Sequence, residues 1–182
     1  MSTIRFETTP LRIGSWTILR LPESASARLP SRGLALVEGT INGFRSKIVL
    51  EPDGKGSHWV RVDTALRKAA GIDAGDAVTM AVAPSKEWPE PEPPSDWNKA
   101  LASDRQAKAL WAKITPMARW DWLRWVRATN SNETRSRRIE VALSKLRAGE
   151  RRPCCFNRNQ CTEPEVSKNG VLIEPTRTSK GV

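Results

Sequence analysis

The chain has 182 residues, of which 38% are hydrophobic and 27% charged, and its mean hydropathy is −0.50. This composition is typical of a soluble globular protein with a packed core, and it excludes a chain that is disordered throughout or embedded in a bilayer. Apolar runs all fall short of the ~20 residues that cross a membrane, and the N-terminus lacks the basic-then-apolar pattern of a signal peptide, so we expect no transmembrane segment and a cytoplasmic location.

The formal net charge is +10, and most of the excess lies in one region. Residues 1–94 contain 12 basic and 11 acidic side chains, whereas residues 95–152 contain 14 basic and 6 acidic ones. A local basic excess favours an acidic partner, which could be a protein patch, an anionic surface or nucleic acid. A solvated basic helix face without any partner is the alternative interpretation.

The cysteines and the single histidine limit the available chemistry. Cys154, Cys155 and Cys161 do not have the spacing of a secreted disulfide framework, so we expect reduced thiols. One histidine leaves too few ligands for a zinc site of usual spacing, and we expect no metal and no cofactor. Because a nucleophilic cysteine needs a base, His58, Cys154 and Cys155 are kept as candidate reactive or structural residues. The chain has no P-loop, dinucleotide-binding motif or nucleophile elbow, so we do not expect an enzyme.

Strand signals fill the first half of the chain. Residues 15–21, SWTILRL, are rich in β-branched and aromatic side chains and predict a strand, while residues 22–32 predict a loop. Residues 35–41 and 44–50 predict two strands joined at the Asn-Gly pair between them, because both positions of such a turn tolerate a positive φ. The sequence therefore predicts a β-hairpin here.

A strand, a short helix and a final strand are predicted next. Residues 58–62 alternate between two faces of a strand. Asp63 is placed to cap a helix over residues 64–70, which Gly71 would end in the left-handed conformation. After a Gly-Asp turn, residues 77–82 predict the last strand.

This second part of the barrel region resembles a known fold. The segment HWVRVDTALRKAAGIDAGDAVTMAV is similar to the strand, short helix and strand unit of AbrB/MazE-type double-split β-barrels. The resemblance implies a fold in which two such units interlock, either from two chains or within one. We favour a monomer, because residues 15–50 could complete the barrel; the alternative is a dimer.

Residues 84–96, PSKEWPEPEPPSD, predict a linker. They contain five prolines and four acidic residues. Proline fixes φ and removes a backbone donor, so the segment should be extended and semi-rigid. We expect a solvated spacer, with transient docking of the acidic linker on the basic helices as the alternative.

Helix signals follow the linker. Ser103 and Gln106 have the spacing of a capping box and predict a helix that ends at Ile114. Thr115 followed by Pro116 predicts the N-cap and first residue of the second helix.

A third helix is predicted over residues 133–148, capped by Asn132 and ended by Gly149, with residues 97–102 as an extra helical turn. Its apolar stripe is formed by Ile139, Ala142, Leu143 and Leu146. The predicted domains are a β-barrel domain (1–83), the linker (84–96), a helical domain (97–152) and an extended or disordered tail (153–182).

The span 116–140, with three tryptophans and six arginines, is where we expect a partner to bind. On a helical wheel Trp122 and Trp125 fall on the core arc, whereas Trp120 falls on a polar arc with Arg124 and Arg127, which predicts a surface position for these arginines. Trp120 either packs within the chain or faces a partner. Arg135 lies beside an apolar stripe, so it either anchors the helix or binds an anion. The candidate residues for partner or anion binding are Trp120, Arg124, Arg127, Arg135, Arg137 and Arg138.

Three longer motifs, LEPDGKGSHW, TPMARWDWLRW and ETRSRRIE, resemble the YdeI/OmpD-associated family, also known as OmdA or bacteriocin-protection proteins. In that family a β-barrel domain of unknown function can precede the helical domain, and the resemblance covers about residues 33–155. It implies a link to resistance against bacteriocins and cationic antimicrobial peptides and to an outer-membrane porin. The resemblance implies no catalytic residue.

We therefore predict an α+β protein, with a small double-split-type β-barrel followed by a three-helix module. The function that we expect is that of a non-catalytic binding protein of this family, with a protein or an anionic surface as its partner. The alternative is a nucleic-acid-binding regulator that uses the barrel or the basic helical face. It is not favoured, because the basic excess lies outside the barrel and the helices lack helix-turn-helix spacing.

Overall fold

The computed structural model describes residues 2–154 and 156–178, which form two compact units. The barrel unit contains the chain up to Glu87, together with Arg158–Cys161 and the segment that begins at Val166. The helical unit contains Trp88–Asn157 and Thr162–Glu165. The predicted α+β class is confirmed, with the sheet in the first unit and the main helices in the second.

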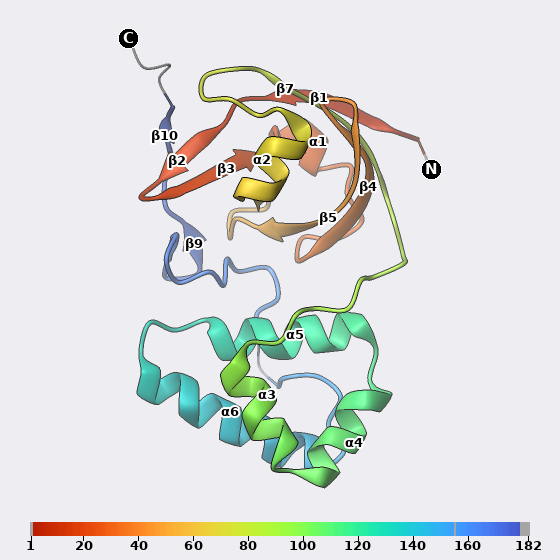
Figure 1. Ribbon diagram of the computed structural model, residues 1–182, viewed down its shortest axis with the longest axis vertical. Helices are drawn as coiled ribbons and strands as arrows, with labels where there is room; N and C mark the ends of the chain where they lie inside the picture. The colour runs from red at the N-terminus through yellow and green to blue at the C-terminus, as the bar shows by residue number, and fades with distance from the viewer. Residues whose placement is uncertain (1, 155, 179–182) are drawn as a thin grey trace. The chain divides into compact units, whose positions relative to one another are not determined.

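The barrel unit is built on a curled antiparallel sheet of eight strands (Figure 1). Their order across the sheet is β1-β7-β4-β5-β6-β3-β2-β10. Although β1 and β2 lie near opposite ends of this order, two residues separate them in the chain, so the sheet must curl back on itself. The strands are β1 (Ile4–Thr8), β2 (Leu11–Ile13), β3 (Trp16–Arg20), β4 (Ala35–Ile41), β5 (Phe44–Pro52), β6 (His58–Arg61), β7 (Val78–Pro84) and β10 (Thr176–Arg177).

The local signals of the barrel unit are confirmed. β4 and β5 form the predicted hairpin, and its turn residues Asn42 and Gly43 have φ values of 49° and 79°. Helix α2 (Thr64–Ala70) begins after Asp63, whose side chain accepts a hydrogen bond from the Leu66 amide at 2.8 Å. Gly71 ends the helix with φ of 60°.

Two strands and a short helix near the N-terminus were not predicted. β1 and β2 lie in a segment without a strong local signal, and β1 is held by β7, more than 70 residues further along the chain. Helix α1 (Glu23–Ser26) lies in the predicted loop. Pairing with a distant strand, rather than local propensity, places β1 in the sheet.

The C-terminal segment is part of the barrel unit, where the sequence predicts an extended or disordered tail. β8 (Ser167–Lys168) and β9 (Val171–Leu172) form a small hairpin, and β10 pairs with β2. This segment covers a cluster separate from the main barrel core, formed by Ile13, Trp16, Ile18, Trp59, Cys161, Val166 and Leu172. Burial of these apolar side chains orders the segment, and the periodicity of the tail did not reveal it.

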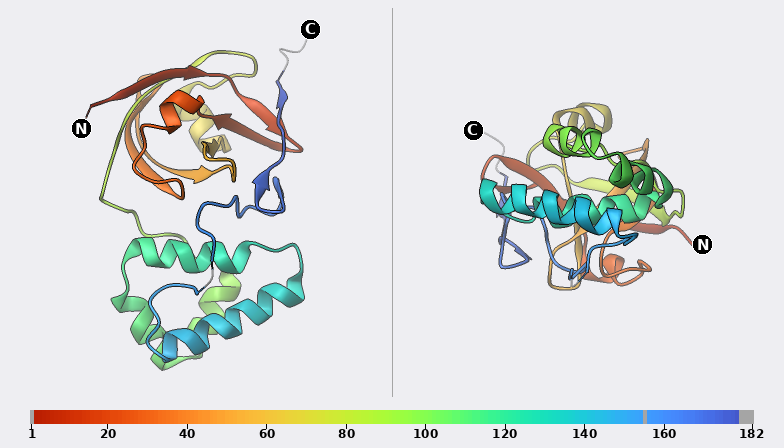
Figure 2. Two further views of the ribbon diagram at one scale, coloured as in Figure 1. Left: turned by 180° about the vertical axis from the view of Figure 1, so that it is seen from behind. Right: turned by 90° about the horizontal axis from the view of Figure 1, so that it is seen from below.

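The helical unit contains α3 (Ser95–Ala102), α4 (Arg105–Lys113), α5 (Pro116–Arg127) and α6 (Asn132–Arg147). The predicted turn at residues 97–102 is a helix of eight residues, and α6 contacts the other three helices (Figures 1 and 2). Thr115 and Pro116 begin α5 as predicted.

Two helix caps differ from the prediction. Asp104, not Ser103, caps α4 by accepting a hydrogen bond from the Ala107 amide, and Ser131, not Asn132, caps α6 by accepting one from the Thr134 amide. In each case a neighbouring residue has equal capping chemistry, so the helix start shifts by one position.

The core of the helical unit includes the predicted stripe of α6. Ile139, Ala142, Leu143 and Leu146 are all buried. Trp97 and Trp122 are fully buried, and Trp97 packs on Trp111 with 4.9 Å between ring centroids.

Candidate functional site

The proline-rich linker lies against α5 within the helical unit. The indole Nε1 of Trp120 donates a hydrogen bond to the backbone carbonyl of Pro89 at 2.8 Å. The guanidinium of Arg119 contacts the carboxylate of Glu90 at 2.5 Å, and Pro91 is buried. This part of the linker is therefore attached to the helical unit, which is the docking alternative raised by the sequence.

Trp120 packs within its own chain. Its side chain is half-buried, and its one hydrogen-bond donor is directed to the linker backbone. Of the two interpretations that the helical wheel left open, internal packing is the one observed.

Arg124 corrects a prediction, because it is not on the surface. Its side chain is 1% exposed, as is that of Asp121, and their Nη1 and Oδ1 atoms are 3.7 Å apart. Arg152 approaches the other Asp121 oxygen at 3.5 Å, and the Phe156 ring lies 5.2 Å from the Arg124 guanidinium carbon. The helical wheel assigned this arc of α5 to solvent, but the chain that follows α6 covers it.

Arg127 and Arg135 are partly buried and paired. Arg127 Nε lies 3.4 Å from a carboxylate oxygen of Glu163. Arg135 donates two hydrogen bonds to the carboxylate of Asp96, at 2.6 and 3.0 Å. These bonds lower the pKa of Asp96 and raise the pKa of Arg135. Arg135 thus anchors α6 to the start of α3.

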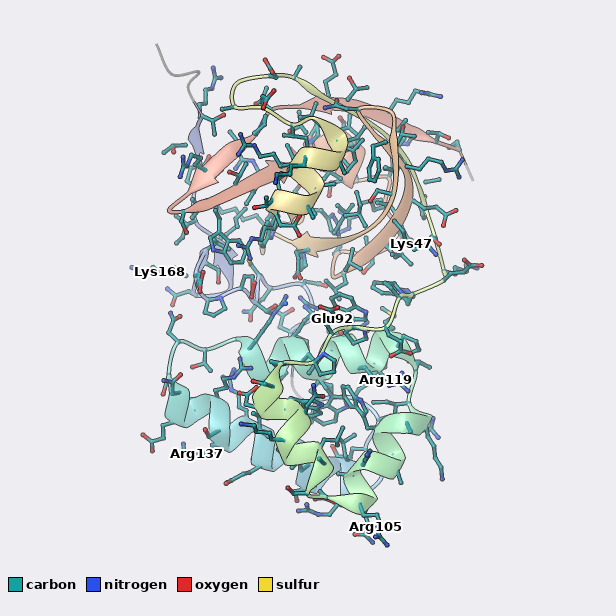
Figure 3. All side chains as sticks on the ribbon, in the orientation of Figure 1. Lys47, Glu92, Arg105, Arg119, Arg137 and Lys168 are labelled. Carbon is teal, nitrogen blue, oxygen red and sulfur yellow. The ribbon has the colours of Figure 1, made fainter. Side chains whose placement is uncertain are left out.

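Arg137 and Arg138 have different roles. Arg138 donates hydrogen bonds to the carbonyls of Trp125 and Ala128, which lie at the C-terminal end of α5, at 2.9 and 3.1 Å. It therefore satisfies carbonyls that the helix leaves without amide partners. The side chain of Arg137 is 67% exposed and pairs with Glu133 on the same helix (Figure 3).

Four of the six candidates line one hollow of about 520 Å³ in the helical unit. Figure 3 shows Glu92 on the linker beside α5, at the edge of this hollow. We call it the α5 pocket, and its lining residues are Glu90, Pro91, Glu92, Pro94, Trp120, Leu123, Arg124, Arg127, Arg135 and Glu163. Three guanidiniums face three carboxylates, so the pocket is balanced in charge.

His58 lies in the barrel core, and both of its ring nitrogens are hydrogen-bonded. It is fully buried, and its Nε2 lies 2.9 Å from the Gly33 carbonyl, so Nε2 must carry the proton. Its Nδ1 then accepts from the Ser26 hydroxyl at 2.5 Å. Burial lowers the pKa of His58 and favours the neutral ring. With both nitrogens occupied, His58 is not available as a general base.

Cys154 and His58 belong to different units of the fold. Cys154 is exposed and belongs to the helical unit, whereas His58 belongs to the barrel unit. Cys155 lies outside the described residues. Within residues 2–154 and 156–178, no three His, Cys, Asp or Glu side chains come together as metal ligands, and no helix is both long and apolar enough to cross a membrane.

Sequence reasoning missed the acidic partners of the arginines. Asp96, Asp121 and Glu163 come from three different segments and have no motif in common. Asp121 lies on α5 itself, three residues before Arg124. Asp96 and Glu163 come from segments that are distant in the sequence, and no local pattern places them beside Arg135 and Arg127.

Comparison with known families matches both units. Residues 90–149 match the model of the family described as bacteriocin-protection, YdeI or OmpD-associated, and residues 2–82 match that of a domain of unknown function (DUF1905). The resemblance noted from the motifs is thereby confirmed. No curated protein matches the chain.

Proposed function

We propose that this chain, which contains a bacteriocin-protection, YdeI or OmpD-associated domain at residues 90–149, acts as a non-catalytic binding protein. The family description supports a role in protection against bacteriocins, and the resemblance noted from the motifs extends the proposal to cationic antimicrobial peptides. The occupied ring nitrogens of His58 support binding over nucleophilic catalysis, because they remove the one histidine as a base.

The ligand that we propose for the α5 pocket is an extended acidic segment of a protein partner. The observation that carries this proposal is the way in which α5 holds the linker, with an indole donating to a proline carbonyl and a guanidinium contacting a glutamate. An indole donor directed at the backbone is a common way to recognise extended proline-rich chain. The linker occupies the donor of Trp120, and the pocket beside it, lined by Arg127 and Arg135, is suited to a second acidic segment.

The charge of the pocket favours a protein over a nucleic acid. Arg127 and Arg135 have side chains that are 26% and 27% exposed, and each already has a carboxylate partner. A single incoming carboxylate can exchange with these partners, whereas nucleic acid brings a closely spaced row of phosphate charges toward Glu90, Glu92 and Glu163.

We also propose that the protein is a cytoplasmic monomer. All eight strands of the curled sheet come from one chain, which supports a barrel unit that needs no second copy. Size-exclusion chromatography with light scattering tests the monomer, and cell fractionation tests the location.

The binding proposal is tested with a labelled synthetic peptide, EWPEPEPP, titrated into the full chain and followed by fluorescence anisotropy. We expect saturable binding that Arg127→Gln weakens about fivefold, since a partly exposed ion pair contributes up to ~1 kcal/mol. Arg105→Gln is the matched control, because Arg105 is exposed on α4 and does not line the pocket. Equal binding by both variants would exclude the α5 pocket.

The biological role needs a separate test. A strain that lacks the gene should be more sensitive to a cationic antimicrobial peptide, and the wild-type gene should restore resistance. If the Arg127→Gln gene restores resistance fully, the pocket is not the functional site. If duplex DNA binds instead of the peptide, with steep salt dependence, the nucleic-acid-binding alternative is favoured.

A further inference from the structure

A second hollow, of about 290 Å³, lies in the barrel unit and is independent of the function proposed above. We call it the arginine cleft. Its walls come from β2, β3, α2, the turn after α2 and β10. The lining residues are Pro10, Arg12, Thr17, Arg67, Ile72, Asp73, Ala74, Arg177 and Thr178.

The fold brings together three arginines that are far apart in the sequence. β10 pairs with β2 in a register that sets Thr176 opposite Arg12 and Arg177 opposite Leu11, so both arginines lie at this edge of the sheet. Arg67 reaches the cleft from α2. The hydroxyl of Thr178 donates to the Pro10 carbonyl and accepts from the Gly75 amide, both at 3.0 Å, which ties β10 to both walls.

These three guanidiniums differ from those of the α5 pocket, because none of them has a carboxylate partner among the described residues. Asp73 is the one acidic residue of the cleft, and it also forms no ion pair with any described residue. The lining residues therefore carry three positive charges and one negative charge. Like charges that line one cleft repel one another, and a bound anion would relieve that repulsion.

We propose that the arginine cleft binds a small phosphorylated compound through its phosphoryl oxygens. The planar guanidinium matches two oxygens of a phosphate at once, and the arginines that line the cleft supply more than one such group for a doubly charged ligand. The hydroxyl of Thr17 lies in the same wall and offers a neutral donor. The volume of the cleft fits a pyrophosphate or a nucleotide phosphate and is too small for a duplex.

Isothermal titration of the full chain with pyrophosphate at low ionic strength tests this site. We expect saturable one-to-one binding that weakens with salt. Arg67→Ala should raise the Kd about fivefold, and Arg12→Ala combined with it should remove measurable binding. Asp73→Asn should lower the Kd, because it removes the one opposing charge.

Arg45→Ala is the matched control, since Arg45 is exposed on β5 outside the cleft. Circular dichroism checks that each variant is folded, and the gain from Asp73→Asn cannot arise from unfolding. The proposal is overturned if pyrophosphate does not bind, or if Arg45→Ala weakens it as much as Arg67→Ala. It is also overturned if duplex DNA or anionic vesicles bind and pyrophosphate does not compete with them.

Discussion

The indole Nε1 of Trp120 and the backbone carbonyl of Pro89 are joined by a hydrogen bond of 2.8 Å, which fixes the linker to α5. Pro89 lies one residue after Trp88, where the helical unit begins. An acidic proline-rich segment is therefore held against α5 instead of running as a free spacer. Its prolines suit this role, because an extended chain that lacks amide donors leaves its carbonyls open to an outside donor.

Trp120→Phe should release the linker, because phenylalanine keeps an aromatic ring and removes the donor. We expect the amides of Trp88, Glu90 and Glu92 to exchange with solvent about fivefold faster, since a hydrogen bond contributes ~1 kcal/mol. Hydrogen exchange followed by mass spectrometry measures this. Glu90→Gln removes only a carboxylate that is 61% exposed and should have a smaller effect. Unchanged exchange in Trp120→Phe would show that the hydrogen bond does not hold the linker.

Asp121→Asn should strongly destabilise the helical unit. The substitution leaves the buried guanidinium of Arg124 facing a neutral amide, and breaking a buried pair costs about 3 kcal/mol or more. Urea-induced unfolding followed by tryptophan fluorescence measures the loss. Glu133→Gln breaks an exposed pair on α6 and should change stability by less than about 0.5 kcal/mol. Similar effects for the two variants would contradict the burial of Asp121.

We expect the free energy of unfolding to fall on mild acidification because His58 is buried. The unfolded chain binds a proton near pH 6.5, whereas burial lowers the pKa of His58 in the folded chain. Its contribution is therefore complete above about pH 6.5 and is lost as the pH falls from there toward the folded pKa. The chain has one histidine, so no other side chain with an ordinary pKa titrates in this window.

Urea unfolding of the wild-type chain at several values between about pH 7.5 and pH 5.5 measures this decline. His58→Asn should flatten the curve, and it should cost about 1–3 kcal/mol near neutral pH because the bonds to Ser26 and Gly33 are weakened or lost. A decline that persists in His58→Asn would assign the pH dependence to another group.

Gly54→Ala should detach the C-terminal segment from the barrel unit. A Cβ atom at Gly54 would lie 2.1 Å from the Gly170 carbonyl oxygen, so the hairpin of β8 and β9 would have to move. We expect faster hydrogen exchange over residues 161–172. Gly56→Ala is the matched control, because it has a similar positive φ of 93° but open space around its Cβ. If both variants behave alike, backbone strain accounts for the effect instead of the clash.

Part of the fold could be predicted because its signals are local. Asp63, Gly71 and Thr115 act on amides or φ values within a few residues, and the structure confirms all three. The stripe of α6 follows from helical periodicity alone. The observed N-cap of α6 is Ser131 and not the predicted Asn132, because both side chains can accept a hydrogen bond from the amides of the first helical turn.

The candidate site was predicted less well, because its properties depend on distant segments. The helical wheel placed Arg124 at the surface, yet residues that follow α6 bury it. The wheel also could not show that Arg135 pairs with Asp96. A wheel reports the direction of a side chain, and only the remainder of the chain determines what covers it.

The amino-acid sequence by itself determined α2 and the main helices of the helical unit, the central hairpin, the family resemblance and the region of basic charge, because these depend on composition and on patterns of a few residues. The tertiary structure alone decided that β1 joins the sheet and that the linker packs against α5. It also decided that Arg12, Arg67 and Arg177 line one cleft. These contacts join segments up to about 165 residues apart. They are set by burial and strand pairing across the whole fold, which no short window of sequence contains.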